Sequence, residues 1–175
     1  MKTISKNIFI QLLLLNFVII LNLSVKSQTS DFTIYKNSYY NFSIQYPRDW
    51  QRNYNLLSSC VFMAQDPNIY YNINVVIISN FEGTLDGFTL DKMNKNARLS
   101  SANMNYISER NLVINGQRCK EYICTASVNG DNLKDFIYEF VKGKNLYNVT
   151  ITSLEENFEK TKSNSLAMIN TFLLF

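Results

Sequence analysis

The chain has 175 residues with 17 basic and 14 acidic side chains, a hydrophobic fraction of 46%, three cysteines and no histidine. The absence of an imidazole excludes a Ser-His-Asp or Cys-His nucleophile system, a His-ligated zinc site and a histidine pH switch. The charged fraction of only 18% argues against a nucleic-acid partner, because proteins that bind nucleic acids carry a strongly basic face.

Residues 1–28 have the three-part layout of a secretory signal peptide. Lys2 and Lys6 precede an almost wholly apolar run from Ile8 to Leu23, and small polar residues follow. The run is shorter than the roughly twenty residues that a membrane span needs, which favours cleavage over the alternative of a retained anchor. The first cysteine is Cys60, so no lipid anchor is expected. We therefore expect export to the periplasm or the extracellular space, with membrane contact only through the signal peptide before cleavage.

Removal of the signal peptide changes the charge balance of the protein. Three lysines leave and no acidic residue leaves with them, so residues 29–175 hold 14 basic and 14 acidic side chains. The basic excess of the whole chain therefore belongs to the export signal. The remaining segment has the length of a single domain.

Period-two alternation of apolar and polar residues predicts strands in the first half of this domain. Residues 32–36 and 42–46 form a hairpin, and residues 60–65 and 73–79 form two further strands. The run from Ile73 to Ile78 is almost continuously apolar, which is typical of a strand covered on both faces.

A four-stranded antiparallel meander is predicted to follow. Asn115-Gly116 supplies the positive φ angles of a type I′ turn between strands 106–114 and 118–128, and strands 133–141 and 146–153 come next. The alternation places Phe136, Tyr138 and Phe140 on one face and Asp135 and Glu139 on the other.

Two segments have helical spacing. Residues 153–156 have the form of a capping box, with Ser153 and Glu156 at its two ends. The apolar stripe of the helix that follows contains Leu154, Phe158, Thr161, Ser165, Ile169 and Phe172. A second helix spans residues 89–102, with Leu90, Met93 and Ala97 on its inner edge. The predicted fold class is α+β, an antiparallel sheet of about six or more strands with helices packed against it.

The stretch from Tyr35 to Trp50, YKNSYYNFSIQYPRDW, resembles the opening of the PsbP family, in which a hairpin ends in a Tyr-Pro-x-x-Trp corner. The order of the later elements agrees with the family over the whole mature chain. The resemblance implies a PsbP-like α/β/α sandwich and a non-enzymatic accessory or assembly protein that acts through its surface. The family includes a lumenal subunit of photosystem II, exported bacterial relatives and a nuclear Ran-binding relative. Its photosynthetic members are linked to calcium, chloride and manganese, but we carry no metal or cofactor across to this histidine-free chain.

The residues of the corner have a structural interpretation of their own. Pro47 has no amide proton and ends the hydrogen-bond ladder of its strand, and Tyr46 continues the inward-facing alternation. Trp50 is the only tryptophan, and we expect its indole to fill the edge of the core.

The three cysteines leave two alternatives open. Cys60 could form a disulfide with Cys119 or Cys124 across neighbouring strands, or all three could be small buried side chains. Cys119 and Cys124 are five residues apart on one strand and face opposite sides, so they are not expected to pair with each other.

The candidate functional residues are exposed aromatic side chains, because the sequence has no catalytic motif. No GxSxG, Walker or GxGxxG motif occurs, and the acidic residues 155, 156 and 159 suit a helix N-terminus. Tyr39-Tyr40 and Tyr70-Tyr71 are each followed by Asn at a turn-to-strand junction, and at least one tyrosine of each pair should reach solvent as a candidate interaction surface.

The sequence therefore predicts an exported, non-enzymatic binding protein that contacts a protein partner at the cell envelope. One alternative is a carrier of a small ligand or metal ion in a cleft between sheet and helix. A second alternative is a secreted hydrolase that works without histidine, which would need two opposed carboxylates.

Overall fold

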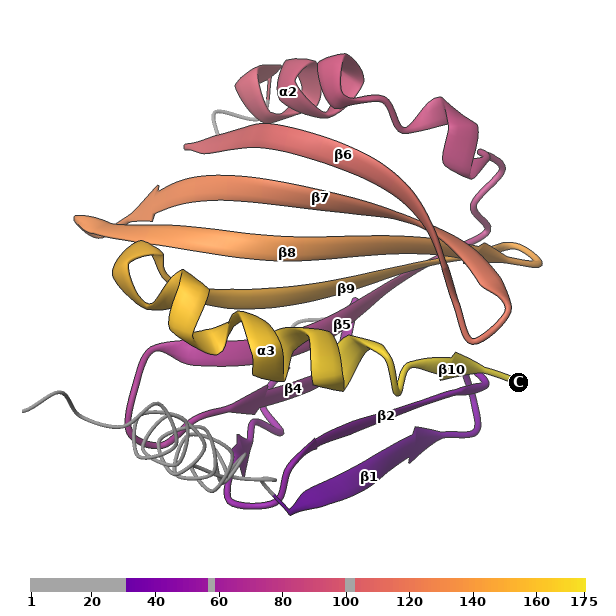
Figure 1. Ribbon diagram of the computed structural model, residues 1–175. Coiled ribbons are helices and arrows are strands. Elements are labelled where there is room, and N and C mark those ends of the chain that lie inside the picture. The colour runs from indigo at the N-terminus through magenta and orange to yellow at the C-terminus, as the bar shows by residue number, and fades with distance from the viewer. Residues whose placement is uncertain (1–30, 57–58, 100–102) are drawn as a thin grey trace, which may run out of the picture. The chain divides into compact units, whose positions relative to one another are not determined.

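Within residues 31–56, 59–99 and 103–175, which the computed structural model describes, the chain forms two antiparallel sheets and two α-helices (Figure 1). These elements belong to one unit, Phe32–Phe175, which is distinct from the segment Met1–Asp31. The expected signal peptide, residues 1–28, lies outside the described residues. The predicted α+β class with an antiparallel sheet is confirmed.

The larger sheet has seven strands in the order β3-β4-β5-β9-β8-β7-β6, and the smaller sheet has three in the order β1-β2-β10. The strands are β1 Phe32–Asn37, β2 Phe42–Pro47, β3 Gln51–Arg52, β4 Cys60–Gln65, β5 Tyr71–Ser79, β6 Met104–Ile114, β7 Gln117–Val128, β8 Asp131–Lys142, β9 Asn145–Leu154 and β10 Leu173–Leu174. The helices are α2 Leu90–Leu99 and α3 Phe158–Ile169, with short 3₁₀ turns at Leu85–Gly87 and Glu155–Asn157.

The meander β6-β7-β8-β9 depends on two Asn-Gly turns. Asn115 and Gly116 have φ angles of 48° and 76°, and the β7–β8 turn repeats this geometry at Asn129 and Gly130 with 53° and 92°. Positive φ at both central residues defines the type I′ turn, whose twist matches that of the strands it joins. The predicted meander and its first turn are confirmed. The Asn115 amide also donates to the carbonyls of Asn170 and Phe172, at 2.9 and 2.8 Å, which ties the first turn to the end of α3.

One face of the seven-stranded sheet, here called the inner face, packs against α3 and the smaller sheet (Figure 1). Alternation along each strand delivers its apolar side chains to this core, as expected for a sheet with one buried face. The predicted core residues Phe136, Tyr138, Phe140, Tyr147, Val149 and Ile151 are all buried there. The stripe predicted for α3 is also buried at Phe158, Thr161, Ser165 and Ile169.

The predicted capping box is wrong. Ser153 is part of β9, where it pairs with Tyr71 on one side and Lys134 on the other, so it does not cap a helix. The pairing of β9 with β8 continues to Leu154, and these ladder bonds hold the backbone extended past the expected helix start. A 3₁₀ turn then leads into α3 at Phe158.

The opposite face, here called the open face, is covered only in part. Leu90 and Met93 of α2 pack on a small cluster around Tyr122 of β7, as predicted for the inner edge of this helix. Asn94 of α2 bonds both backbone groups of Tyr106, accepting from its N–H at 2.8 Å and donating to its carbonyl at 2.9 Å. Farther along the sheet, Ile78 of β5 is 49% exposed. The prediction that β5 is covered on both faces is therefore wrong, because α2 lies beside β6 at the far edge (Figure 1).

Candidate functional site

The structure places one tyrosine of each predicted pair in solvent. Tyr39 is 84% exposed and Tyr70 is partly exposed. Tyr40 is half-buried, and its backbone carbonyl accepts a hydrogen bond from the Tyr147 hydroxyl at 2.8 Å. Tyr71 is buried, and its hydroxyl donates to the carbonyl of Thr161 on α3 at 3.1 Å.

The two tyrosine pairs do not come together into one surface. Tyr147, which holds the Tyr39-Tyr40 turn, is the register partner of Ile77 near the end of β5. Tyr71 lies at the beginning of β5, so about 20 Å of strand separates the two positions. A single partner surface containing both pairs would have to extend along the whole strand.

The corner residues lie at the edge of the core. The backbone N–H of Trp50 donates to the Pro47 carbonyl at 3.1 Å, which closes the turn at the end of β2. The Trp50 indole is buried and meets the Tyr71 ring edge-on, with 4.7 Å between ring centroids. Tyr46 is buried beside Phe62. These contacts make Tyr46 and Trp50 part of the buried core.

Of the two alternatives for the cysteines, the disulfide is not formed. Cys60 lies on β4, whereas Cys119 and Cys124 lie on β7, and three strands stand between β4 and β7. Four strand spacings amount to about 19 Å, whereas a disulfide joins Cα atoms about 5.5–6 Å apart. All three thiols are free. Cys119 and Cys124 are buried on opposite faces of β7, which agrees with the alternative of small buried side chains.

A cluster of Tyr35, Arg52 and Tyr54, here called the arginine–tyrosine cluster, lies where β3 joins the sheet. The Arg52 guanidinium is 4.7 Å from the ring centroid of Tyr35 and 4.7 Å from that of Tyr54. Tyr54 is 75% exposed, so the cluster reaches solvent. The Nε of Arg52 is buried and has no hydrogen-bond partner in the part of the chain that the structure describes. The guanidinium makes a cation–π contact with each of the two rings.

The sequence patterns did not predict this cluster. The only local signal is the spacing of Arg52 and Tyr54, two residues apart, which puts them on one side of an extended segment. Tyr35 comes from a different strand and joins them through the tertiary fold. The proximity also influences Tyr46, whose pKa is raised by burial while the nearby Arg52 charge partly lowers it.

The open face carries a band of polar side chains over three central strands. Asp135 of β8 lies opposite Thr152 of β9, which in turn lies opposite Asn72 of β5. Nearer the other end of β8, Glu139 accepts a hydrogen bond from the Asn148 amide at 2.8 Å. Burial raises the pKa of Glu139 to about 7 and also raises the pKa of Asp135. One oxygen of each carboxylate has no hydrogen-bond partner among the described residues.

A groove of about 470 Å³ lies over one end of this polar band. Its lining residues are Met63, Tyr70, Asn72, Asn74, Asn103, Met104, Ala126, Ser127, Val128, Leu133, Asp135 and Thr152. Asn72, Asn74, Asp135 and Thr152 come from β5, β8 and β9, and the apolar walls come from β4, β6, β7 and β8. The groove combines a carboxylate, neutral hydrogen-bonding groups and apolar surface, which is the usual composition of a small-molecule site.

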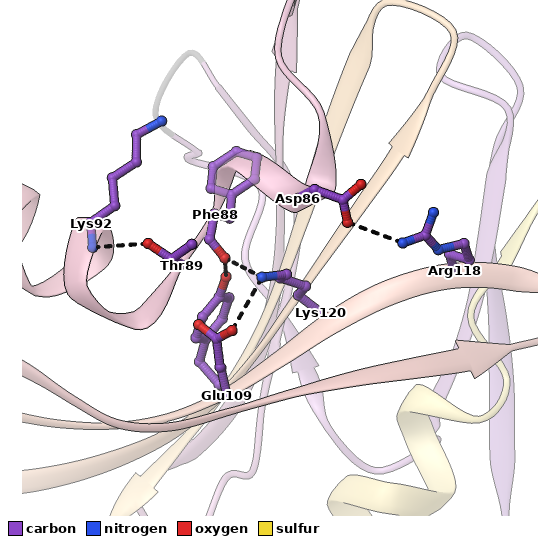
Figure 2. A network of polar contacts seen from close by, with 8 residues as sticks. Asp86, Phe88, Thr89, Lys92, Glu109, Arg118 and Lys120 are labelled. Atoms are coloured by element: carbon purple, nitrogen blue, oxygen red, sulfur yellow. Dashed lines mark hydrogen bonds and ion pairs between the residues drawn. The ribbon is translucent and has the colours of Figure 1, made fainter.

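Residues 80–89 are fastened to the open face by a buried lysine. Lys120 of β7 donates to the Phe88 carbonyl at 2.6 Å and to the Glu109 carboxylate at 3.3 Å (Figure 2). The Tyr122 hydroxyl donates to the same carbonyl at 2.7 Å. Arg118 and Asp86 add an exposed ion pair of 3.1 Å nearby (Figure 2). Because a buried ammonium needs acceptors, this network fixes the segment that leads into α2.

The large antiparallel sheet, with α3 and a small sheet on its inner face and α2 at the edge of its open face, has the PsbP-like fold. No family model and no curated protein matches the sequence. Among solved structures, cyanobacterial PsbP (CyanoP) from Synechocystis sp. PCC 6803 matches with a TM-score of 0.66 and 14% identity, covering 86% of this chain and 96% of that chain.

Two further structures have the same fold. The Ran-binding protein Mog1p of Saccharomyces cerevisiae has a TM-score of 0.57 and 8% identity, over 83% of this chain and 96% of its own. LpqN, involved in cell envelope biogenesis of Mycobacterium tuberculosis, has a TM-score of 0.52 and 11% identity, over 85% of this chain and 87% of its own. At such identities the likeness concerns the fold.

Within residues 31–56, 59–99 and 103–175, no helix is both long and apolar enough to cross a membrane. No three His, Cys, Asp or Glu side chains within the same ranges gather into a group that could hold a metal ion.

Proposed function

We propose that this protein is an exported, non-enzymatic PsbP-like accessory protein, with residues 29–175 as its domain, that binds a protein partner at the cell envelope. The signal-peptide layout of residues 1–28 supports export. The neighbours in fold include one protein named for binding Ran and one named for envelope biogenesis.

The arginine–tyrosine cluster is the observation that carries the proposal. Arg and Tyr are enriched among the residues that dominate protein–protein binding energy. Arg52 is held in place by Tyr35 and Tyr54 before any partner arrives, so little side-chain entropy is lost on binding. A carboxylate is the acceptor that matches the donor edge of a guanidinium. The partner is therefore expected to present an Asp or Glu side chain.

The hydrolase alternative receives less support from the carboxylates on the open face. Asp135 and Glu139 project from the same strand four residues apart, which places them about 13 Å apart along β8. The two carboxyl groups of an inverting glycosidase are at most roughly 9.5 Å apart, and those of a retaining enzyme are closer.

The proposal is tested by crosslinking the epitope-tagged full-length protein in its native cells and quantifying captured proteins by mass spectrometry. Tyr54→Ala and Arg52→Lys should lose the specific partner, because they remove the aromatic clamp and the planar guanidinium. Tyr39→Ala removes another exposed tyrosine, which lies in the β1–β2 turn and outside the cluster, and should retain the partner.

Loss of the partner with Tyr39→Ala but not with Tyr54→Ala would transfer the proposal to the β1–β2 turn. Retention in all three variants would contradict a role for the cluster. Cell fractionation tests the remaining part of the proposal, and an uncleaved protein found in the cytoplasm would contradict export.

A further inference from the structure

We propose that the groove on the open face is a binding site for a small molecule that carries a primary ammonium group on a short aliphatic chain. The groove lies on the opposite face of the sheet from the arginine–tyrosine cluster, because Arg52 stacks above the core residue Phe62. The inference is therefore independent of the proposed protein partner.

Charge selects a cation for this groove. Asp135 is the only charged side chain among the described residues that line the groove, so a cation is the charged group that can pair with the lining. The residue is only 5% exposed, and a hydrogen bond from Thr152 satisfies part of its carboxylate. Its Oδ1 has no partner in the described chain. A buried carboxylate without a counter-charge is costly, and a cationic ligand removes that cost.

The neutral groups of the groove suit an ammonium group. A primary ammonium has three N–H donors and no acceptor. Asp135 supplies one acceptor, the Thr152 hydroxyl lies opposite it in the neighbouring strand, and the amides of Asn72 and Asn74 belong to the same groove. A divalent metal ion takes six or more oxygen ligands and usually several carboxylates, whereas this groove offers a single carboxylate.

The walls of the groove suit an aliphatic chain. Met63 and Met104, with Val128 and Leu133, supply the apolar part of the lining. Methionine side chains are flexible and polarisable, so they adapt to an alkyl chain without a fixed shape. Tyr70 completes the lining and can place its ring against a cation. A fully hydrated inorganic ion has no alkyl chain, so it would gain nothing from these apolar side chains.

The test titrates the purified protein with n-pentylammonium chloride and follows backbone amide shifts by NMR. We expect saturable shifts centred on Asn72, Asp135 and Thr152. The uncharged analogue 1-pentanol should bind at least about tenfold more weakly, because it lacks the charge that pairs with Asp135. Asp135→Asn should reduce n-pentylammonium affinity by a similar factor. Glu159→Gln, the same chemical change on the exposed side of α3, should leave it unchanged.

Several outcomes would overturn the assignment. They are equal affinity for the ammonium and the alcohol, unchanged affinity in Asp135→Asn with an unaltered melting temperature, or shifts centred elsewhere. Absence of saturable shifts up to about 10 mM ligand would have the same meaning, because it places the Kd above about 10 mM. Nα-acetyl-lysine amide mimics a lysine side chain of a protein. If it binds more weakly than n-pentylammonium, the small-molecule assignment is supported, and if it binds more tightly, the assignment is overturned.

Discussion

Lys120 and Glu139 face each other across β7 and β8, yet their charged groups have different partners. The Lys120 ammonium donates to the Phe88 carbonyl and to Glu109, whereas Glu139 accepts from Asn148. The lysine is thus used to fasten residues 80–89, and Glu139 is left as a buried carboxyl on the open face. This arrangement raises the pKa of Glu139 to about 7, chiefly because burial disfavours the ionised form.

Replacing Glu139 by Gln should stabilise the protein at alkaline pH. The native pKa of about 7 lies above the ordinary value of 4.5, so the native state holds a proton that the unfolded state releases between these values. Stability is therefore full below pH 4.5 and falls as the pH rises to 7, by about 3 kcal/mol. Glu139→Gln should recover most of this free energy of unfolding at pH 8 and little of it at pH 4. Urea denaturation at both values measures the difference, and an unchanged pH slope would contradict the prediction.

Replacing Asn115 by Asp should weaken the connection between the meander and α3. Aspartate accepts the positive φ of the turn but cannot donate to the carbonyls of Asn170 and Phe172. We expect a loss of about 1–3 kcal/mol in the free energy of unfolding. Asn129→Asp makes the same change in the second Asn-Gly turn and should cost less than about 0.5 kcal/mol. Equal effects in the two turns, measured by urea denaturation, would refute the role of the Asn115 amide.

Removing the Tyr71 hydroxyl should destabilise the protein, whereas removing that of Tyr70 should not. Tyr71 bonds the Thr161 carbonyl and lies 2.9 Å from the Ser165 hydroxyl, joining β5 to α3. Tyr71→Phe should cost about 1 kcal/mol, and a double-mutant cycle with Ser165→Ala should show coupling. Tyr70→Phe, one residue away at the surface, should be neutral. A neutral Tyr71→Phe in thermal and urea unfolding would disprove this contribution.

The thiols should react in the order of their burial. Burial raises the pKa of Cys119 and of Cys124 to about 12, and it also raises the pKa of the partly exposed Cys60. At pH 8 a thiol reagent such as Ellman's should therefore modify at most Cys60 in the native protein, because the thiolate is the reactive form. In denaturant all three should react. Fewer than three reactive thiols would indicate a disulfide and contradict the separation of β4 and β7.

Local sequence patterns predicted the strands, the meander and both helices well, because each depends on a period or a turn within a short window. Asn115-Gly116 fixed one hairpin, and the alternation along β8 correctly separated Phe136 from Asp135. The capping-box prediction failed because a motif of four residues competed with a full β9 ladder, and the ladder prevailed. Tertiary pairing of this kind is not encoded in the motif itself.

The candidate surfaces were harder to predict because they combine distant residues. Tyr35 and Arg52 meet only because Tyr35 of β1 stacks on Phe62 of β4 while Arg52 of β3 pairs with the same strand. Asp135 and Asn72 share the groove only through the pairing order β5-β9-β8. The strand order also decides between the two alternatives for the cysteines, because nothing in the spacing of Cys60 and Cys119 shows that three strands lie between them. The alternation along each strand predicted which face of the sheet a side chain occupies, but it did not predict which strands lie next to each other.

The two hydrogen bonds from Asn94 to the backbone of Tyr106 also influence how separate molecules behave toward each other. Tyr106 belongs to β6, the outermost strand of the seven-stranded sheet, and an outer strand is a template on which another chain can add. Asn94 occupies the donor and acceptor positions that an added strand would use there. Detachment of α2 would therefore leave this part of the edge open to an added strand from another molecule.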